Sequence, residues 1–210
     1  MIKKNRAVLI ITSIIILIPM LAGVILWDRL PDVIATHFGV GNEADGWSSK
    51  GFTVFGLPLI MLALQWVCVF ATLADPKKQN ISPTMFRLVL WIIPAISVII
   101  MTVIYAMALE VIVNVGMVCV ILVGVMSTVL GNYMPKCRQS YTMGYKLLWT
   151  LNDEGNWNAT HRFAGWMMTI GGVVLLVTSP FGILWISLPV MIVTAFAPVV
   201  YSFVYYLRHK

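Results

Sequence analysis

Four long apolar stretches, with one charged residue among them, alternate with short polar segments along the chain. They are residues 7–27, 52–74, 88–135 and 163–207. A helix needs about 20 apolar residues to cross a bilayer, so the first two stretches fit one crossing each and the last two fit a pair each. Glu110 interrupts the third stretch near its middle, and Ser179-Pro180-Phe181-Gly182 interrupts the fourth, as tight turns would. The pattern therefore predicts about six transmembrane helices.

Composition supports this interpretation. Of the 210 residues, 60% are hydrophobic and 10% are charged, whereas about 25% charged residues is usual for soluble proteins. So few charged side chains could not cover the surface of a soluble protein of this size, and a lipid bilayer is the partner that resolves the mismatch. We therefore expect an all-α, polytopic helical membrane protein.

Basic residues predict the orientation. All but two of the 14 fall on one side of the predicted spans, namely Lys3, Lys4, Arg6, Lys77, Lys78, Arg87, Lys136, Arg138, Lys146, Arg162, Arg208 and Lys210. Arg29 and Lys50 fall on the other side. Because cytoplasmic segments are enriched in Lys and Arg, both termini are predicted to be cytoplasmic, N-in/C-in. The net charge of +6 is divided among small groups rather than one stripe, so we expect no direct binding of nucleic acid.

Two polar segments are large enough to carry function, an outer loop at 28–51 and an inner loop at 131–162. In the outer loop, His37 lies near Glu43 and Asp45, which could bind a divalent metal. Their spacing matches no specific ligand pattern, however, and turn chemistry with Asp45-Gly46 at its tightest point is favoured. We expect no metal there.

The inner loop leads into the fifth predicted span. Asn152 is a plausible helix N-cap, and a helix that starts there places Trp157, His161 and Gly165 on one face. One interpretation is an interfacial anchor, since Trp, Tyr and Arg side chains belong at headgroup depth. The other is a recognition or regulatory surface that faces the cytoplasm. Residue chemistry alone leaves both interpretations open.

Motifs typical of enzymes are missing from the sequence. There is no nucleophile elbow, P-loop, Rossmann fingerprint or HExxH, and Cys68, Cys119 and Cys137 lie in no CxxC or Cys/His spacing. Glu110 is expected to be solvated at an outer turn rather than buried. Gly23 and Gly171-Gly172 are predicted to allow close helix packing. We therefore expect no catalytic residues and no cofactor.

Residues in and beside the two loops resemble a known family. The inner set is Gly131-Asn132-Tyr133-Met134-Pro135, Gly144, Trp149-Thr150-Leu151, Trp157 and Thr160-His161-Arg162-Phe163-Ala164-Gly165. The outer set is Leu30-Pro31, His37-Phe38-Gly39 and Asp45-Gly46-Trp47-Ser48-Ser49-Lys50. The inner set resembles the signature of the SdpI family, and the outer set resembles the DUF1648 segment that commonly precedes it. The family usually has Asn where Ser140 stands and Arg where Lys146 stands.

The resemblance implies a division into residues 1–75, two spans with a DUF1648-like extracytoplasmic loop, and residues 76–210, four SdpI-like spans with a cytoplasmic loop. SdpI-family members are membrane proteins of bacteria, named for immunity to the sporulation-delaying peptide toxin. A multi-pass toxin-immunity protein of the bacterial cell membrane is therefore expected. The best-known member is also a signalling receptor that holds a cytoplasmic transcriptional autorepressor at the membrane.

A peptide toxin and a cytoplasmic transcriptional repressor are thus the implied partners. The residues expected to bind on the toxin side are Pro31, His37, Phe38, Asp45 and Trp47. Those expected to form the cytoplasmic motif are Asn132, Pro135, Gly144, Lys146, Trp149, Thr150, Trp157, His161, Arg162 and Gly165. Two alternatives stay open: a membrane enzyme or transporter in which His161 and Arg162 act on a lipid headgroup or other anionic substrate, and a signalling protein that confers no protection.

Overall fold

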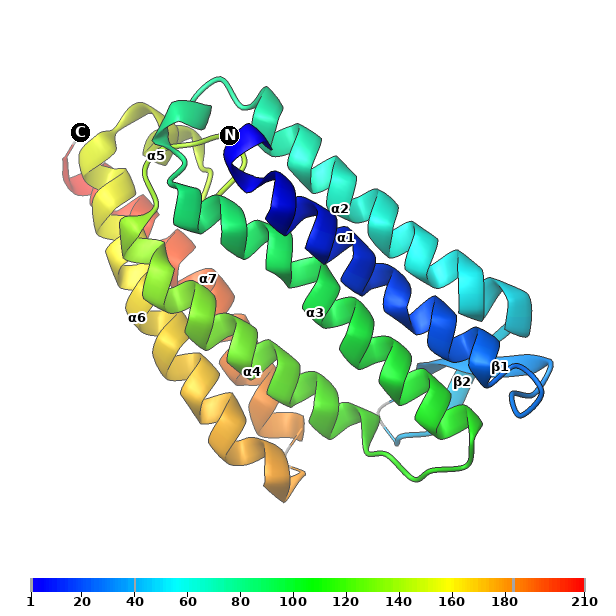
Figure 1. Ribbon diagram of the computed structural model, residues 1–210. Coiled ribbons are helices and arrows are strands. Elements are labelled where there is room, and N and C mark those ends of the chain that lie inside the picture. Colours follow the sequence, from blue (N-terminus) through cyan, green and yellow to red (C-terminus); the bar gives the residue numbers. More distant parts are fainter. Residues whose placement is uncertain (1, 40, 183, 210) are drawn as a thin grey trace. The chain divides into compact units, whose positions relative to one another are not determined.

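The computed structural model describes residues 2–39, 41–182 and 184–209 (Figure 1). Within this part of the chain, six helices are long and apolar enough to cross a membrane, which confirms the predicted spans. The long helices are α1 (Ile2–Ile25), α2 (Leu57–Ala74), α3 (Pro83–Ala108), α4 (Val115–Tyr133), α6 (Glu154–Thr178) and α7 (Leu184–Arg208). A π-helical turn, η1 (Phe52–Gly56), leads directly into α2. An even number of spans leaves both termini on one side, and the basic residues assign that side to the cytoplasm, although Lys210 lies outside the described residues.

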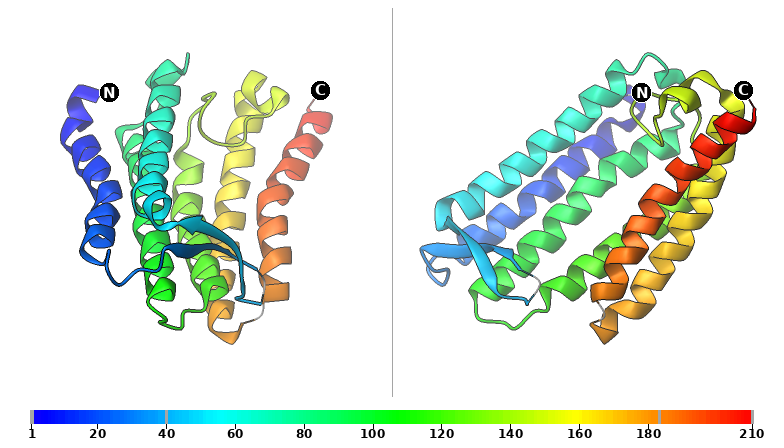
Figure 2. Two further views of the ribbon diagram at one scale, coloured as in Figure 1. Left: turned by 90° about the vertical axis from the view of Figure 1, so that its right-hand side faces the viewer. Right: turned by 180° about the vertical axis from the view of Figure 1, so that it is seen from behind.

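The chain forms two compact units. The first contains the residues up to Leu73 together with Phe86–Val115, and thus α1, α2 and most of α3. The second contains Ala74–Met85 and the chain from Gly116 onward, and thus α4, α6 and α7. In both views of Figure 2, α6 and α7 lie side by side. The family-based division near residue 75 remains a prediction.

Tight turns separate the paired spans as the sequence predicts. Between α3 and α4, Glu110 is exposed and adopts a positive φ of 63°. The acid therefore lies at a turn, not at mid-membrane. After α6, a 3-10 turn η4 (Ser179–Phe181) ends at Gly182, which has a φ of 65°.

The first unit packs its helices around one apolar core with few polar links. The core residues are Leu30, Ile34, Val54, Met101, Ile104 and Tyr105. The Tyr105 hydroxyl donates to the Pro19 carbonyl of α1 at 3.0 Å. A Cβ on Gly23 would lie 2.5 Å from that hydroxyl oxygen, so glycine permits this contact and the predicted close packing is confirmed. The buried Gln65 amide joins all three helices by donating to Thr12 of α1 and to the Leu90 carbonyl of α3.

The outer loop contains a β-hairpin that the sequence did not predict. Strands β1 (Val33–Phe38) and β2 (Ala44–Ser49) pair antiparallel. Asp45-Gly46 is therefore inside a strand, and the expectation that it forms the tightest point of a turn was wrong. The chain reverses between Gly39 and Glu43 instead, where the Gly39 N–H donates to the Glu43 carbonyl and Asn42 has a φ of 65°. Glycine at 46 allows the two strands to pair closely, because a Cβ there would lie 2.9 Å from the Cβ of His37 on the paired strand.

Candidate functional site

The outer hairpin, residues 33–49, presents an exposed and mixed surface. Val33 and Trp47 are 60% and 59% exposed, and the Asp45 carboxylate contacts Nδ1 of the exposed His37. Ile34, by contrast, is buried in the core of the first unit. The structure thus brings three predicted toxin-side residues together on the hairpin's exposed surface. Pro31 is exposed just before the first strand, whereas Phe38 is half-buried.

The base and the tip of this hairpin are both anchored. At the base, Lys50 pairs with Asp32 at 3.1 Å and lies over the Trp27 ring. At the tip, the Asn42 amide donates to the Val113 carbonyl at 3.0 Å and accepts from the Val115 N–H at 2.7 Å. The exposed surface is therefore held on a rigid support, which favours recognition.

The second unit buries its polar groups instead. Asp75, only 3% exposed, accepts through one carboxylate oxygen from the Tyr141 N–H, the Thr142 N–H and the Thr142 hydroxyl, at 2.8, 2.9 and 2.8 Å. Its other oxygen accepts from the Lys77 N–H at 2.7 Å. Burial by itself raises the pKa of Asp75, but these hydrogen bonds outweigh it and leave the pKa below its usual value. The carboxylate therefore stays ionised and holds the 141–142 loop through hydrogen bonds.

Gln139 adds hydrogen bonds to the segments on both sides of this loop. Its side chain accepts from Lys77 Nζ at 3.0 Å and donates to the Thr150 carbonyl at 3.0 Å, while its own carbonyl accepts from Asn80. Ser140, where the family usually has Asn, hydrogen-bonds through its hydroxyl to both the N–H and the carbonyl of Met143. We call residues 74–82 and 134–162 the inner cap.

His161 lies at the centre of the inner cap and is completely buried. Its Nε2 accepts from the Tyr145 N–H at 3.0 Å, and its Nδ1 lies 2.8 Å from the Trp157 carbonyl. These partners require the neutral ring with the proton on Nδ1. Gly144 has a φ of 94°, and a Cβ there would lie 2.1 Å from Nε2. The loop and the ring therefore fit together only with glycine at this position.

Trp157 packs against the same ring. The two rings stack with centroids 4.0 Å apart, and the indole N–H donates to the Cys137 carbonyl at 2.7 Å. Burial raises the pKa of the Cys137 thiol to about 11 and also raises the pKa of the Tyr145 phenol. Trp157 and His161 share one face of α6, as predicted, but that face is an internal packing surface.

A second buried network ties the inner cap to α7. The Asn156 amide donates to the Ser202 carbonyl, and its oxygen accepts from the hydroxyls of Thr160 and Ser202. The Trp149 indole N–H donates to the Ser202 hydroxyl at 2.8 Å. Thr150 closes the adjoining turn, donating to the Tyr145 carbonyl and accepting from the Leu147 N–H.

The start of α6 differs from the prediction by one residue. Asn152 ends the short helix α5 (Leu148–Asn152), and Asp153 is the N-cap of α6, accepting from the Gly155 N–H at 2.8 Å. Both residue types are good N-caps. The preceding α5 turn includes Asn152 and leaves the capping position to its neighbour.

Glycines allow α4 and α6 to approach backbone to backbone. A Cβ on Gly131 would lie 2.9 Å from the Gly165 carbonyl oxygen, and one on Gly172 would lie 2.6 Å from that of Gly124. A Cβ on Gly165 would also meet the Pro135 ring at 2.7 Å. The predicted close packing at Gly172 is confirmed, and Gly165 contributes in the same way.

Comparisons with known proteins match both regions. A family model described as the SdpI/YfhL protein family matches residues 136–205. Another, described as a domain of unknown function (DUF1648), matches residues 14–62. The immunity protein SdpI of Bacillus subtilis (strain 168) is 26% identical over 211 aligned positions, covering 99% of this chain and 97% of that protein. No solved structure matches the chain.

These matches make the chain similar to the SdpI/YfhL family. The six apolar spans and this similarity mark a multi-pass protein of the cell membrane. The SdpI/YfhL match begins in the inner cap and continues through α6 and most of α7, whereas the DUF1648 match contains the whole outer hairpin. The outer segment that the sequence singled out lies within one matched region, and most of the inner segment lies within the other.

Four of the ten residues predicted to form the cytoplasmic motif are exposed. They are Asn132, Pro135, Lys146 and Arg162. Lys146 Nζ makes one long contact, 3.4 Å, with the Thr142 carbonyl. The other six motif residues pack inside the second unit or line its turns. Six of the ten predicted motif residues therefore support the fold, and four remain on the surface.

Sequence reasoning missed four residues that organise the inner cap, namely Asp75, Gln139, Asn156 and Ser202. Asp75 is visible in the sequence as an isolated acid after an apolar stretch, but nothing there pairs it with residues 141–142. Ser202 lies inside an apolar run and gives no signal beyond being polar. Their distant partners, 46 to 67 positions away, are set by tertiary contacts.

Proposed function

We propose that this SdpI/YfhL-like protein is a membrane immunity protein that protects its cell from a secreted antimicrobial peptide toxin. The observation that carries the proposal is the similarity to an immunity protein along 99% of the chain. It is supported by the outer hairpin, an exposed surface on the side that a secreted peptide reaches first.

The outer hairpin has the chemistry to contact an amphipathic peptide. Trp47 and Val33 offer apolar area, and His37 with Asp45 offers polar contacts next to it. Exposed aromatic side chains on a rigid support lose little conformational entropy on binding, so they are effective anchors. Binding there would bring the peptide to the protein before it reaches unprotected bilayer.

A survival assay tests the immunity proposal. A Bacillus subtilis strain without its own SdpI, exposed to the sporulation-delaying peptide toxin, should survive when this chain is expressed. The matched control is the same strain with an empty vector. Immunoblotting of washed membranes must show equal insertion for every variant, and killing of cells that hold well-inserted protein would refute the proposal.

We further propose that toxin-bound protein holds a cytoplasmic transcriptional repressor at the inner cap. A cleft of about 620 Å³ in the second unit is lined by residues of α5, α7 and the following turns: Leu148, Trp149, Asn152, Asp153, Phe203, Tyr206 and His209. Leu148 is 79% exposed on this cytoplasmic side. An exposed apolar side chain beside an aromatic cleft favours a protein partner.

Membrane fractionation tests this second activity. Toxin should move a repressor from the soluble fraction to the membrane fraction in cells that express the chain, as measured by quantitative mass spectrometry. Leu148→Glu should prevent that movement and leave survival unchanged. The control is Leu207→Glu, at an exposed leucine in α7. Repressor capture without any protection would instead support a protein that only signals.

The enzyme or transporter alternative finds less support in the geometry. His161 is buried, and both of its ring nitrogens are occupied by backbone groups. Arg162 next to it is exposed but has no partner group for acid–base chemistry in the described structure. The similarity to an immunity protein likewise supports a non-enzymatic role.

A further inference from the structure

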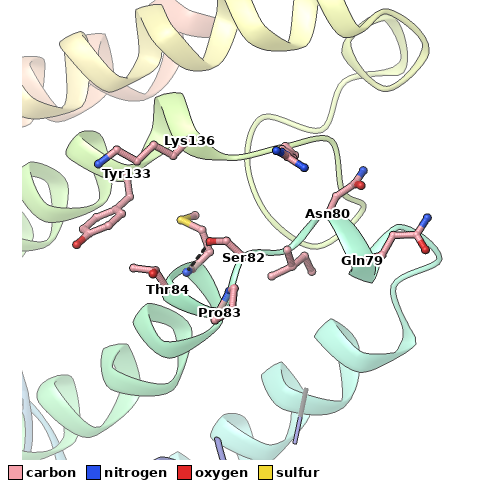
Figure 3. Close-up of a pocket in the computed structure, with 10 residues that line it drawn as sticks. Gln79, Asn80, Ser82, Pro83, Thr84, Tyr133 and Lys136 are labelled. Carbon is pink, nitrogen blue, oxygen red and sulfur yellow. Dashed lines mark hydrogen bonds between the residues drawn. The ribbon is translucent and has the colours of Figure 1, made fainter. Parts of the chain in front are cut away.

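A second cleft in the same unit has a different character. Its volume is about 630 Å³, and it is lined by the η2 segment (Lys78–Asn80), the first turn of α3 and the end of α4. The lining residues are Gln79, Asn80, Ile81, Ser82, Pro83, Thr84, Met85, Tyr133, Lys136 and Arg138. Figure 3 shows Tyr133 and Lys136 on one wall and Ser82, Pro83 and Thr84 on the other. Neither the toxin nor the repressor proposal uses this cleft.

The charge of this cleft is positive and uncompensated. Lys136 and Arg138 are the charged residues among those lining it, and both are exposed. The ion pairs found in the described part of the chain, His37–Asp45 and Lys50–Asp32, all belong to the first unit. Asp75, the acid in the adjoining segment, directs both oxygens to the donors of the inner cap. The two cations therefore have no carboxylate partner.

Polar donors complement the two cations. Lys136 Nζ lies 5.0 Å from the centroid of the Tyr133 ring, which holds the ammonium group beside the cleft. The Ser82 hydroxyl accepts from the Met85 N–H at 3.2 Å, so its own proton is available to a ligand. The first turn of α3 adds the positive end of a helix dipole. Together these groups suit a phosphate group.

The position of the cleft decides which phosphate compound fits. Pro83 begins one candidate span, and Lys136 ends another. The cleft therefore lies where two helices enter the cytoplasmic leaflet, at the depth of lipid headgroups. Anionic lipids are attracted to Lys and Arg at this depth, and the guanidinium group of Arg can bind a phosphate with two hydrogen bonds.

We propose that this cleft binds the phosphate headgroup of an anionic phospholipid, with Lys136 and Arg138 as the charged contacts. The lipid's glycerol and acyl chains extend along the apolar helices into the bilayer. The site would attach the second unit to the anionic cytoplasmic leaflet whether or not a toxin or a repressor is bound.

Native mass spectrometry of the full-length protein in detergent tests the site. The probes are phosphatidylglycerol and the zwitterionic phosphatidylcholine. Lys136→Gln with Arg138→Gln should weaken phosphatidylglycerol binding about thirtyfold, because two cations are lost at headgroup depth. The same double variant should change phosphatidylcholine binding little. Arg6→Gln with Arg208→Gln removes two exposed cytoplasmic charges elsewhere and should leave binding unchanged.

Two further arms make the test decisive. The charge-preserving double variant Lys136→Arg with Arg138→Lys should retain binding, which separates loss of charge from misfolding. Inorganic phosphate should not displace the lipid at equal concentration. Displacement would show that the site takes a soluble phosphate and would overturn the lipid assignment. Equal phosphatidylglycerol binding by all variants would overturn it too. So would a polyglutamate peptide that displaces the lipid more strongly than phosphate does.

Discussion

The outer hairpin and the inner cap use the same residue types in opposite ways. His37 and Asp45 contact each other on an exposed surface, whereas His161 and Asp75 are buried and bind backbone groups. A buried polar group that loses its partner costs far more than an exposed one, which water can satisfy. The hairpin can therefore change its surface without unfolding, and the cap cannot. Recognition fits the first region, and structural integrity depends on the second.

The largest effect on stability is expected at Gly144. Gly144→Ala adds a methyl group against His161 Nε2 at a φ of 94°, so both strain and a lost hydrogen bond follow. We expect about 4 kcal/mol of destabilisation in equilibrium unfolding in mixed micelles. Gly182→Ala is the control, because its φ is also positive but nothing lies within 4 Å of the added atom. Equal losses in the two variants would show that backbone conformation alone matters.

Asp75 provides the next test. Asp75→Asn keeps the shape of the side chain but removes the charge and turns an acceptor into a donor, so we expect a loss of about 3 kcal/mol. Asp45→Asn in the hairpin should change stability by less than about 0.5 kcal/mol. Unfolding of both variants beside the wild type gives the comparison. A hairpin variant as unstable as the cap variant would contradict it.

The stabilisation by Asp75 should also depend on pH. Its folded pKa lies below the ordinary value of 3.8, so the contribution is complete above that value and is lost as the pH falls through the folded pKa. The gap between wild type and Asp75→Asn should therefore be constant from pH 7 to pH 5 and close only in stronger acid. A gap that closes near neutral pH would identify another group.

His161→Phe tests the buried ring itself. Phenylalanine can keep the stacking on Trp157 but leaves the Tyr145 N–H without an acceptor, which should cost about 2 kcal/mol. Labelling by a maleimide, in a background with Cys68 and Cys119 replaced by Ser, should then reach Cys137 faster. His37→Phe in the hairpin is the matched control and should leave both measurements unchanged. An unaffected His161→Phe protein would show that the ring is not a structural element.

The smallest effect on stability, and the largest on protection, is expected at Trp47. Trp47→Ala removes an exposed side chain, so unfolding should change by less than about 0.5 kcal/mol. Survival in the toxin assay should nevertheless fall by at least about tenfold, as for loss of an interface anchor. Trp166→Ala, at a tryptophan of α6 that is 67% exposed, should leave survival intact. Full protection by the Trp47 variant would remove the hairpin from the proposal.

The sequence was sufficient for the spans because bilayer thickness imposes a length that apolar runs reveal directly. It placed Glu110 at a turn for the same reason. The hairpin was missed because β2 contains Asp, Gly and Ser, which are poor strand formers. Its pairing depends instead on Ile34 entering the core and on Asn42 binding the α3–α4 turn.

The interior of the cap could not be predicted for a different reason. The motif residues were found, but His161 binds a backbone N–H in a loop, and Asp75 binds two more from a distant segment. Backbone donors look the same at every position, so no residue type signals them. Only the fold shows that His161 is an internal support and that Lys146 and Arg162 face outward.

The glycine contacts between α4 and α6 also restrict how these helices can move. Gly131 faces Gly165, and Gly124 faces Gly172, so a displacement along the helix axes by one helical turn, about 5.4 Å, would bring larger side chains against backbone oxygens. A change of register between α6 and α4 is therefore blocked in both directions. Large movements transmitted along this pair must carry the two helices together.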